Sequence, residues 1–226
     1  KIADSLSLNE NSKTLEIGCG WGGFSEYLAK KYNVIIDCIT ISKEQFEYTK
    51  KRIFESGLNN KVNVKFLDYR DLNSKYDSIA SIEMIEAVGE NYLNQYFRTI
   101  KSSLVPGGKA AIQGITIKDE LFDRYRLNED FIQKYIFPGG FLPSLDLIKK
   151  LTKKNQLNIE KVNSYSTDYA KTLSIWRRNF LKSWERINLL GFDETFKKMW
   201  EFYLSYCEAG FKSKNIDLIQ FSMQNK

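Results

Sequence analysis

The residues best suited to chemistry form a glycine-rich turn near the N-terminus, Glu16-Ile17-Gly18-Cys19-Gly20-Trp21-Gly22-Gly23. Glycines let the backbone approach a ligand closely, and the helix expected to follow offers unpaired N–H groups. The glycine spacing is tighter than in the dinucleotide-binding fingerprint, and an acidic residue precedes it. Because the Glu16 carboxylate suits a cation, the turn predicts a site for a ligand with a positive centre and no pyrophosphate. An ordinary tight turn is the alternative interpretation.

Polar residues also follow the second and third strands that the sequence predicts. Thr40-Ile41-Ser42, with Gln45 one turn along, offers hydroxyls and an amide that suit ribose, although Ser42 and Gln45 equally suit a helix capping box. Asp68 ends the third strand and Tyr69 follows it. This pair suits an adenine amino group and ring, and a simple turn explains Asp68 as well.

Two carboxylates follow the fourth predicted strand, in Glu83-Met84-Ile85-Glu86. Ligands on open α/β sheets bind beyond the carboxyl ends of the strands, so this position suits the reacting end of a cofactor. We therefore interpret Glu86 as a site carboxylate and Glu83 as a neighbour of the cofactor. The alternative for Glu86 is a solvated residue that opens the next helix.

Apolar periodicity and glycine positions predict the elements that hold these residues. Apolar, β-branched runs alternate with amphipathic segments through the first half, which is typical of a doubly wound, mostly parallel sheet. A turn is expected at Pro106-Gly107-Gly108. Strands are expected at residues 14–17, 34–40, 62–67, 78–84, 110–117, 157–162 and 216–223, and helices at 24–32, 42–56, 169–189 and 194–209.

The chain is expected to form a single domain over residues 1–226. The alternation breaks between residues 118 and 150, in a charged and aromatic segment that we interpret as an insertion over the site. Residues 168–212 are expected to supply helices on the same substrate side. Aromatic side chains at helical spacing there suit either a substrate tunnel or an ordinary core.

Composition restricts the chemistry. The chain has no histidine, which excludes histidine-dependent triads and the usual zinc sites. Its three cysteines are widely spaced and predict neither a disulfide framework nor a metal site. A formal charge of +6 favours an anionic partner, either a phospholipid surface or RNA. Without a long apolar stretch or a signal-peptide core, a cytoplasmic location is expected.

With these residues in place, the whole chain resembles the cyclopropane-fatty-acid synthases, which are Rossmann-like class I methyltransferases with a seven-stranded sheet. The resemblance implies S-adenosylmethionine as cofactor and methyl transfer to a cis double bond of unsaturated phospholipid acyl chains. Loss of a proton then closes a cyclopropane ring. It also implies the cofactor-binding residues Glu16, Gly18, Cys19, Gly20, Gly22, Thr40, Ile41, Ser42, Gln45, Asp68, Tyr69 and Glu83.

The resemblance assigns the catalytic residues too. Glu86 and Tyr169 match family residues that hold bicarbonate, the expected proton acceptor. Gln113 stands where the family commonly has histidine; it can donate a hydrogen bond but cannot carry a proton. Cys207 matches a cysteine proposed as catalytic, although from the residues alone we favour a buried helix thiol without a positive partner.

The family's segment upstream of the first strand has no counterpart here. From this we expect weaker S-adenosylmethionine binding than in a longer relative, because the cofactor loses covering surface. The alternatives are a methyltransferase that makes a methyl-branched lipid or acts on a small molecule, and a truncated, non-catalytic binding domain. RNA methylation rests on charge alone, and no nucleic-acid partner is expected. Peripheral association with an anionic membrane surface is expected, and homo-oligomerisation is left open.

Overall fold

A computed structural model describes residues 1–226 and contains one seven-stranded sheet with the order β3-β2-β1-β4-β5-β7-β6. β1 pairs in parallel with β2 and β4, β2 with β3, and β4 with β5. The α/β fold predicted from the sequence is therefore confirmed. The strands are β1 (Lys13–Ile17), β2 (Ile35–Thr40), β3 (Val62–Phe66), β4 (Tyr76–Ile82), β5 (Leu104–Ile117), β6 (Leu157–Ser164) and β7 (Ile216–Asn225).

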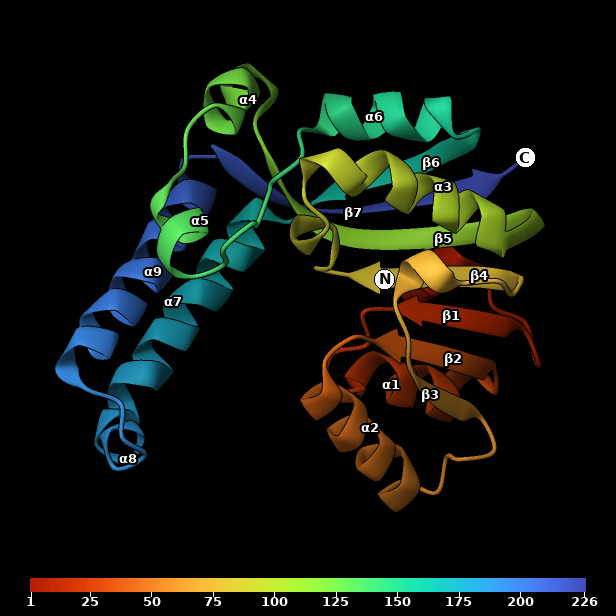
Figure 1. Cartoon of the computed structure of the whole chain (residues 1–226), viewed down its shortest axis with the longest axis horizontal. Coiled ribbons are helices and arrows are strands. Elements are labelled where there is room, and N and C mark those ends of the chain that lie inside the picture. The colour runs from red at the N-terminus through yellow and green to blue at the C-terminus, as the bar shows by residue number, and fades with distance from the viewer. The chain divides into compact units, whose positions relative to one another are not determined.

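Helices follow most of the strands (Figure 1). The α-helices are α1 (Gly23–Tyr32), α2 (Lys43–Glu55), α3 (Leu93–Ser103), α4 (Asp119–Arg126), α5 (Phe131–Tyr135), α6 (Leu145–Lys154), α7 (Ser166–Lys182), α8 (Trp184–Asn188) and α9 (Glu194–Lys212). Short 3-10 helices are η1 (Ala3–Leu6), η2 (Tyr69–Asp71), η3 (Ile85–Ala87) and η4 (Glu90–Tyr92).

The chain divides into two compact units. The first unit comprises residues 1–114, 146–163 and 220–226, and the second comprises residues 115–145 and 164–219. β5 and β7 contribute residues to both units. The single domain expected from the sequence stays a prediction. Most of the expected insertion and substrate-side helices fall in the second unit, whereas α6 falls mainly in the first.

The first unit holds every predicted cofactor residue. α1 and α2 pack against β2 and β3, and their apolar faces join the buried side chains of β2 in one cluster. Ile2 and Leu6 pack against Ala80 and Ala111 of the central strands, so the N-terminal residues are anchored to the sheet. Burial on both faces explains why these strands read as continuous apolar runs.

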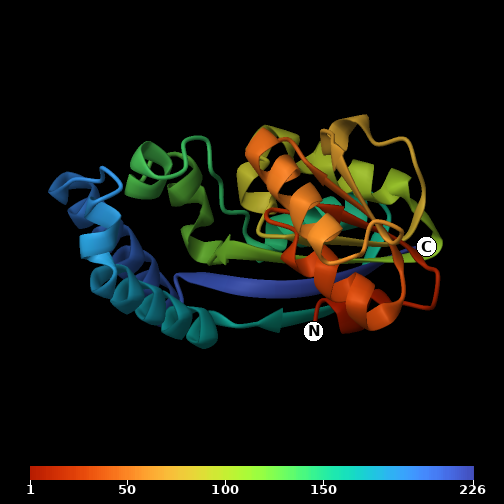
Figure 2. The same cartoon turned by 90° about the horizontal axis from the view of Figure 1, so that it is seen from below.

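The second unit is built on a hairpin of two long helices. α7 and α9 pack along each other, and α8 lies at the end of the hairpin (Figures 1 and 2). Buried Leu173, Leu204 and Phe211 form its centre, with Tyr169 and Cys207 packed against them. α4 and α5 belong to the same unit.

Two sequence expectations about elements were wrong. The expected helix at 169–189 is two helices, because Ser183 ends α7 and α8 begins at Trp184. Residues 106–108 lie inside β5, where the register against β4 shifts between Tyr76 and Ser78 and accommodates the extra residues. The segment 118–150 contains α4, α5 and the start of α6. None of the helices is both long and apolar enough to cross a membrane.

Candidate active site

The glycine turn joins the carboxyl end of β1 to α1 and is fixed to the neighbouring strand. The backbone N–H groups of Gly18 and Cys19 both donate to the Ile39 carbonyl of β2, each over 3.0 Å. Gly18, Gly20 and Gly22 have φ values of +77°, +52° and +80°. L-residues rarely adopt this left-handed region, so the turn requires glycine at alternate positions.

Space around the three glycines differs. A Cβ on Gly22 would lie 2.6 Å from Thr49 Cγ2 of α2, and one on Gly18 would lie 3.0 Å from Met84 Cγ. A Cβ on Gly20 would meet nothing within 4 Å. Gly22 therefore serves close helix packing, whereas the backbone at Gly20 borders open space that a ligand can use.

Glu16 lies at the foot of this turn and is buried. Burial raises the pKa of its carboxyl to about 8, although a hydrogen bond donated by the Ser25 hydroxyl of α1 opposes the increase. No Lys or Arg pairs with Glu16. A ligand with a positive centre would supply the missing countercharge, which agrees with the chemistry predicted from the sequence.

The residues after β2 form a small polar cluster. Ser42 is the N-cap of α2 and accepts a hydrogen bond from the Gln45 backbone N–H at 3.2 Å. The expected reciprocal capping box was wrong: Gln45 Oε1 accepts from the Thr40 hydroxyl at 2.8 Å, and the Ser42 N–H donates to Thr40 Oγ1. The Thr40 hydroxyl therefore bonds to both Ser42 and Gln45. Ile41, between Thr40 and Ser42 in the sequence, is exposed.

Asp68 is held by its own neighbour. Its carboxylate accepts hydrogen bonds from the backbone N–H of Arg70 at 2.9 Å and from the Arg70 guanidinium at 3.0 and 2.6 Å. These bonds hold the pKa of Asp68 below its usual range. The Tyr69 ring packs edge-on against buried Tyr96, with 5.7 Å between ring centroids. Asp68 is thus an ionised acceptor at the carboxyl end of β3.

Glu83, the first residue after β4, meets Gln113 of β5. Gln113 Nε2 donates to Glu83 Oε1 at 2.7 Å, and Gln220 Nε2 of β7 donates to Gln113 Oε1 at 2.7 Å. Glu83 has φ +52°, a conformation that costs energy for a residue with a Cβ. Gln220, which the sequence did not identify, fixes which way the Gln113 amide faces.

Glu86 lies in η3, directly after β4, and is partly buried. A Cβ added to Gly114 would lie 2.5 Å from Ile85 Cγ2 and 3.6 Å from Glu86 Oε1. Gly114 therefore leaves room for the turn that carries Glu86. The structure places Glu83, Glu86 and Gln113 at one end of the sheet within the first unit.

Tyr169 and Cys207 lie in the second unit. The Tyr169 ring packs against Phe211 at 4.8 Å and against Trp176 at 6.0 Å. Burial, with the nearby charge of Asp130, raises the pKa of the Cys207 thiol to about 12. A thiol in this state is neutral near pH 7, so the geometry favours the packing interpretation of Cys207 over a nucleophile.

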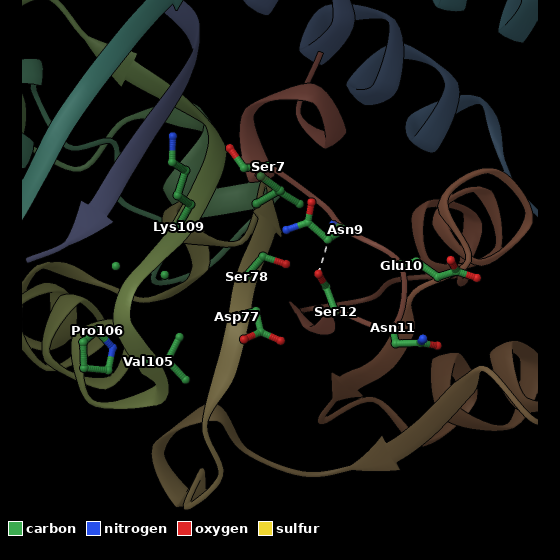
Figure 3. A pocket seen from close by; sticks show the side chains of 13 residues that line it. Ser7, Asn9, Glu10, Asn11, Ser12, Asp77, Ser78, Val105, Pro106 and Lys109 are labelled. Atoms are coloured by element: carbon green, nitrogen blue, oxygen red, sulfur yellow. Dashed lines mark hydrogen bonds between the residues drawn. The ribbon is translucent and has the colours of Figure 1, made fainter.

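A polar cavity of about 480 Å³ lies at the opposite end of the sheet (Figure 3). Its lining comes from residues 6–12 before β1 and from the first residues of β4 and β5, including Asp77, Ser78 and Lys109. It contains none of the predicted site residues. No group of three or more Cys, Asp or Glu side chains is placed to hold a metal ion.

The parallel sheet, the glycine turn after β1 and the polar residues after β2, β3 and β4 together define a Rossmann-like class I methyltransferase fold. Residues 1–221 match the family described as Mycolic acid cyclopropane synthetase. The chain belongs to this family.

Comparisons with individual proteins agree with this family membership. The chain is 39% identical over 224 residues to the tuberculostearic acid methyltransferase UfaA1 of Mycobacterium tuberculosis, covering 99% of this chain and 52% of that protein. It is 36% identical to the cyclopropane-fatty-acyl-phospholipid synthase of Escherichia coli, covering 97% and 55%. The chain thus spans about half the length of these curated relatives. Mycolic acid cyclopropane synthase CmaA1, solved with SAH and CTAB, superimposes with a TM-score of 0.91 at 26% identity, covering 99% and 81%.

Alanine substitutions in the glycine turn separate packing from ligand binding. Gly22→Ala combines a left-handed φ with a 2.6 Å contact, so we expect the free energy of unfolding to decrease by about 2–4 kcal/mol. Gly20→Ala has only the backbone cost of about 1–2 kcal/mol, but its methyl group would enter the open space. Urea denaturation measures the first effect, and calorimetric titration with S-adenosylmethionine measures the second. Equal stability of the two variants would contradict this division.

Proposed function

We propose that this chain transfers the methyl group of S-adenosylmethionine to a cis double bond of unsaturated phospholipid acyl chains and forms cyclopropane fatty acids. The family supports the general reaction, and the relative from Escherichia coli carries this activity in its name. The identity of the methyl acceptor is the part of the proposal that must be argued from the residues of the site.

The observation that carries the proposal is that the glycine turn after β1 and the segment that carries Glu86 after β4 begin at the same end of the sheet. β1 and β4 pair in parallel with Ile17 opposite Ser81, and the Ser81 hydroxyl donates to the Ile17 carbonyl at 3.1 Å. The residues that follow the two strands therefore start side by side. Met84, two residues before Glu86, lies against the turn that is proposed to hold the methyl donor, since a Cβ on Gly18 would be 3.0 Å from its Cγ.

Residues at the carboxyl ends of β1, β2 and β3 have the chemistry that S-adenosylmethionine requires. The buried carboxylate of Glu16 suits its positive charge, the Thr40 and Ser42 hydroxyls with Gln45 suit ribose, and the ionised Asp68 suits an adenine amino group. When bound, the cofactor supplies an electrophilic methyl group. The backbone around Gly20 leaves the open space that a ligand needs.

Glu86 is proposed to act after the methyl group reaches the acyl chain. The second carbon of the former double bond then carries positive charge, which a partly buried carboxylate stabilises. Bicarbonate is the proposed proton acceptor, as the family resemblance implies, and the chain has no histidine that could act as base instead. Gln113 has one amide N–H beyond the bond to Glu83 for holding an anion. The role of Tyr169, which lies in the second unit, stays a prediction. Cys207 is not assigned a chemical step.

The acceptor implies a partner surface. A phospholipid acyl chain reaches the protein from a membrane, so we propose peripheral association with an anionic phospholipid surface, which the formal charge of +6 favours. No helix could cross the bilayer, and this proposal needs none.

The proposal is tested by incubating the protein with methyl-labelled S-adenosylmethionine, bicarbonate and vesicles of dioleoylphosphatidylglycerol. Mass spectrometry of the released fatty acids should show one labelled CH₂ unit, and mild catalytic hydrogenation should leave the mass of the product unchanged because no double bond remains. Calorimetry on the same preparation measures cofactor binding. Cofactor binding without any label in the lipid would contradict catalysis and favour a non-catalytic binding domain.

A second product has its own support. The relative with 39% identity is a tuberculostearic acid methyltransferase, and Gln113 cannot carry a proton. If the cationic acyl chain loses a different proton, no ring closes and a branched chain with a double bond remains. The two products are isomers of equal mass, so the fatty acids are also measured after mild catalytic hydrogenation: the branched product gains two hydrogens, whereas the cyclopropane product keeps its mass.

A further inference from the structure

The end of the α7–α9 hairpin exposes apolar side chains that the proposed chemistry does not use. Leu189 and Leu190 are 86% and 76% exposed, and Phe192 is 42% exposed. They follow α8 and precede α9, and we refer to residues 189–192 as the hairpin tip (Figure 1). Single exposed apolar residues are common, but three within four residues on a protruding turn mark an interaction site.

The hairpin tip is a closed turn. The N–H groups of Leu190 and Gly191 donate to the carbonyls of Ile187 and Asn188 at 3.0 and 2.9 Å, and Asn188 Nδ2 donates to the Phe192 carbonyl at 2.9 Å. The Phe192 ring packs on Phe196, with 4.5 Å between ring centroids. The leucines are therefore held in exposed positions by a hydrogen-bonded backbone, and little conformational entropy is lost when they are buried.

Basic side chains surround the hairpin tip. Lys182, Arg186 and Lys198 are exposed and form no ion pair. Three acidic residues lie between Lys182 and Lys198: Glu185 is exposed, Asp193 caps α9 at the Phe196 N–H, and Glu194 accepts from Trp184 Nε1 and pairs with Lys197. Residues 166–198 contain seven Lys or Arg and four Asp or Glu, a net charge of +3. Exposed cations next to protruding leucines complement the phosphates and acyl chains of a bilayer.

We propose that the hairpin tip inserts Leu189, Leu190 and Phe192 into the interface of a phospholipid bilayer while Lys182, Arg186 and Lys198 contact the headgroups. The inference deepens the proposed function and rests on it, because an acyl acceptor must be taken from a membrane. A bilayer suits the tip better than a protein partner does. A stable protein interface buries about 800 Å² on each side, which a four-residue protrusion cannot provide alone.

The test compares the double variant Leu189→Ser/Leu190→Ser with Leu127→Ser. Leu127, at the end of α4 in the same unit, is 81% exposed and makes the control matched in residue type and exposure. Binding is measured by sedimentation with vesicles made from equal parts of dioleoylphosphatidylcholine and dioleoylphosphatidylglycerol. We expect the double variant to bind at least about tenfold more weakly and Leu127→Ser to bind like the wild type. Circular dichroism confirms folding, and S-adenosylmethionine affinity should be unchanged in both.

Wild-type vesicle binding by the double variant, or equal losses in the double variant and Leu127→Ser, would overturn the proposal. Light scattering without vesicles provides a further test: if the double variant lowers the molecular mass of the protein, the tip is a contact between copies and the proposal fails. Tip-dependent vesicle binding by a wild type that methylates no lipid would support the inference while contradicting the proposed function. Methylation of detergent-dispersed phospholipid by the double variant would support both.

Discussion

Replacing Glu86 by Gln is expected to lower the rate of methyl transfer by about 10²- to 10⁴-fold, the range typical of a positioned acid or base. The substitution keeps the size of the side chain and removes its charge. If the carboxylate after β4 stabilises the cationic acyl chain or orients the proton acceptor, the loss falls on turnover, whereas the affinity for S-adenosylmethionine stays close to that of the wild type. Initial rates with labelled cofactor and calorimetric titration measure the two quantities separately.

Glu83→Gln provides the comparison for this prediction. Glu83 lies three residues earlier and accepts a hydrogen bond from Gln113, which a Gln side chain can still accept through its carbonyl oxygen. If Glu83 lies beside the cofactor, its substitution should weaken S-adenosylmethionine binding more than it lowers the rate of the bound enzyme. A Glu86→Gln variant with wild-type turnover would remove Glu86 from the mechanism. A variant in which affinity falls as much as rate would make it a cofactor ligand.

Most of the first unit could be predicted because its signals are local. Strands buried on both faces produce apolar runs such as residues 34–40. Parallel pairing brings the carboxyl ends of the strands to one edge, so residues far apart in sequence fell correctly at one end of the sheet. The Ser42 cap followed from the same local rules, although Thr40, rather than Gln45, accepts the hydrogen bond from the Ser42 N–H.

The features that could not be predicted from the sequence depend on contacts between residues that are far apart in the chain. Gln220 lies 107 residues from Gln113, and no periodicity or motif connects them. Likewise, a proline followed by glycines predicts a turn from the sequence alone. That residues 106–108 instead form an irregular part of β5 depends on the pairing of β5 with β4, which the sequence does not show. The division into two units was also hidden, because β5 and β7 contribute to each without any break in their apolar pattern.

The stability of the ligand-free protein should depend on the protonation of Glu16. Burial raises the pKa of this carboxyl from 4.5 to about 8, so the folded protein binds this proton more tightly than the unfolded chain does. The contribution of Glu16 to the free energy of unfolding is therefore fully present below about pH 4.5 and decreases as the pH rises towards 8. Above that pH it is constant. At about 1.4 kcal/mol for each pKa unit, the change amounts to a few kcal/mol.

Glu16→Gln isolates this contribution, because the variant keeps a neutral group at the position and loses the titration. Carboxyls with a lowered pKa, such as Glu26 with a value of about 2, contribute equally to both proteins and cancel in the difference. Urea denaturation between pH 5 and 8 should show the wild type losing stability relative to the variant. Parallel curves for the two proteins would mean that Glu16 is already ionised when the protein folds.

Binding of S-adenosylmethionine should reverse the effect of burial on Glu16. A positive centre near the carboxyl favours its ionised form, so the ligand lowers the pKa of Glu16 and releases a proton near pH 7, where the ligand-free carboxyl is mostly protonated. The affinity should therefore increase as the pH rises towards 8. Calorimetry in buffers of different ionisation enthalpy measures the proton release directly, and Glu16→Gln should bind without it. Equal proton release by the two proteins would place the linked proton on another group and leave the buried carboxylate without a part in recognising the cation.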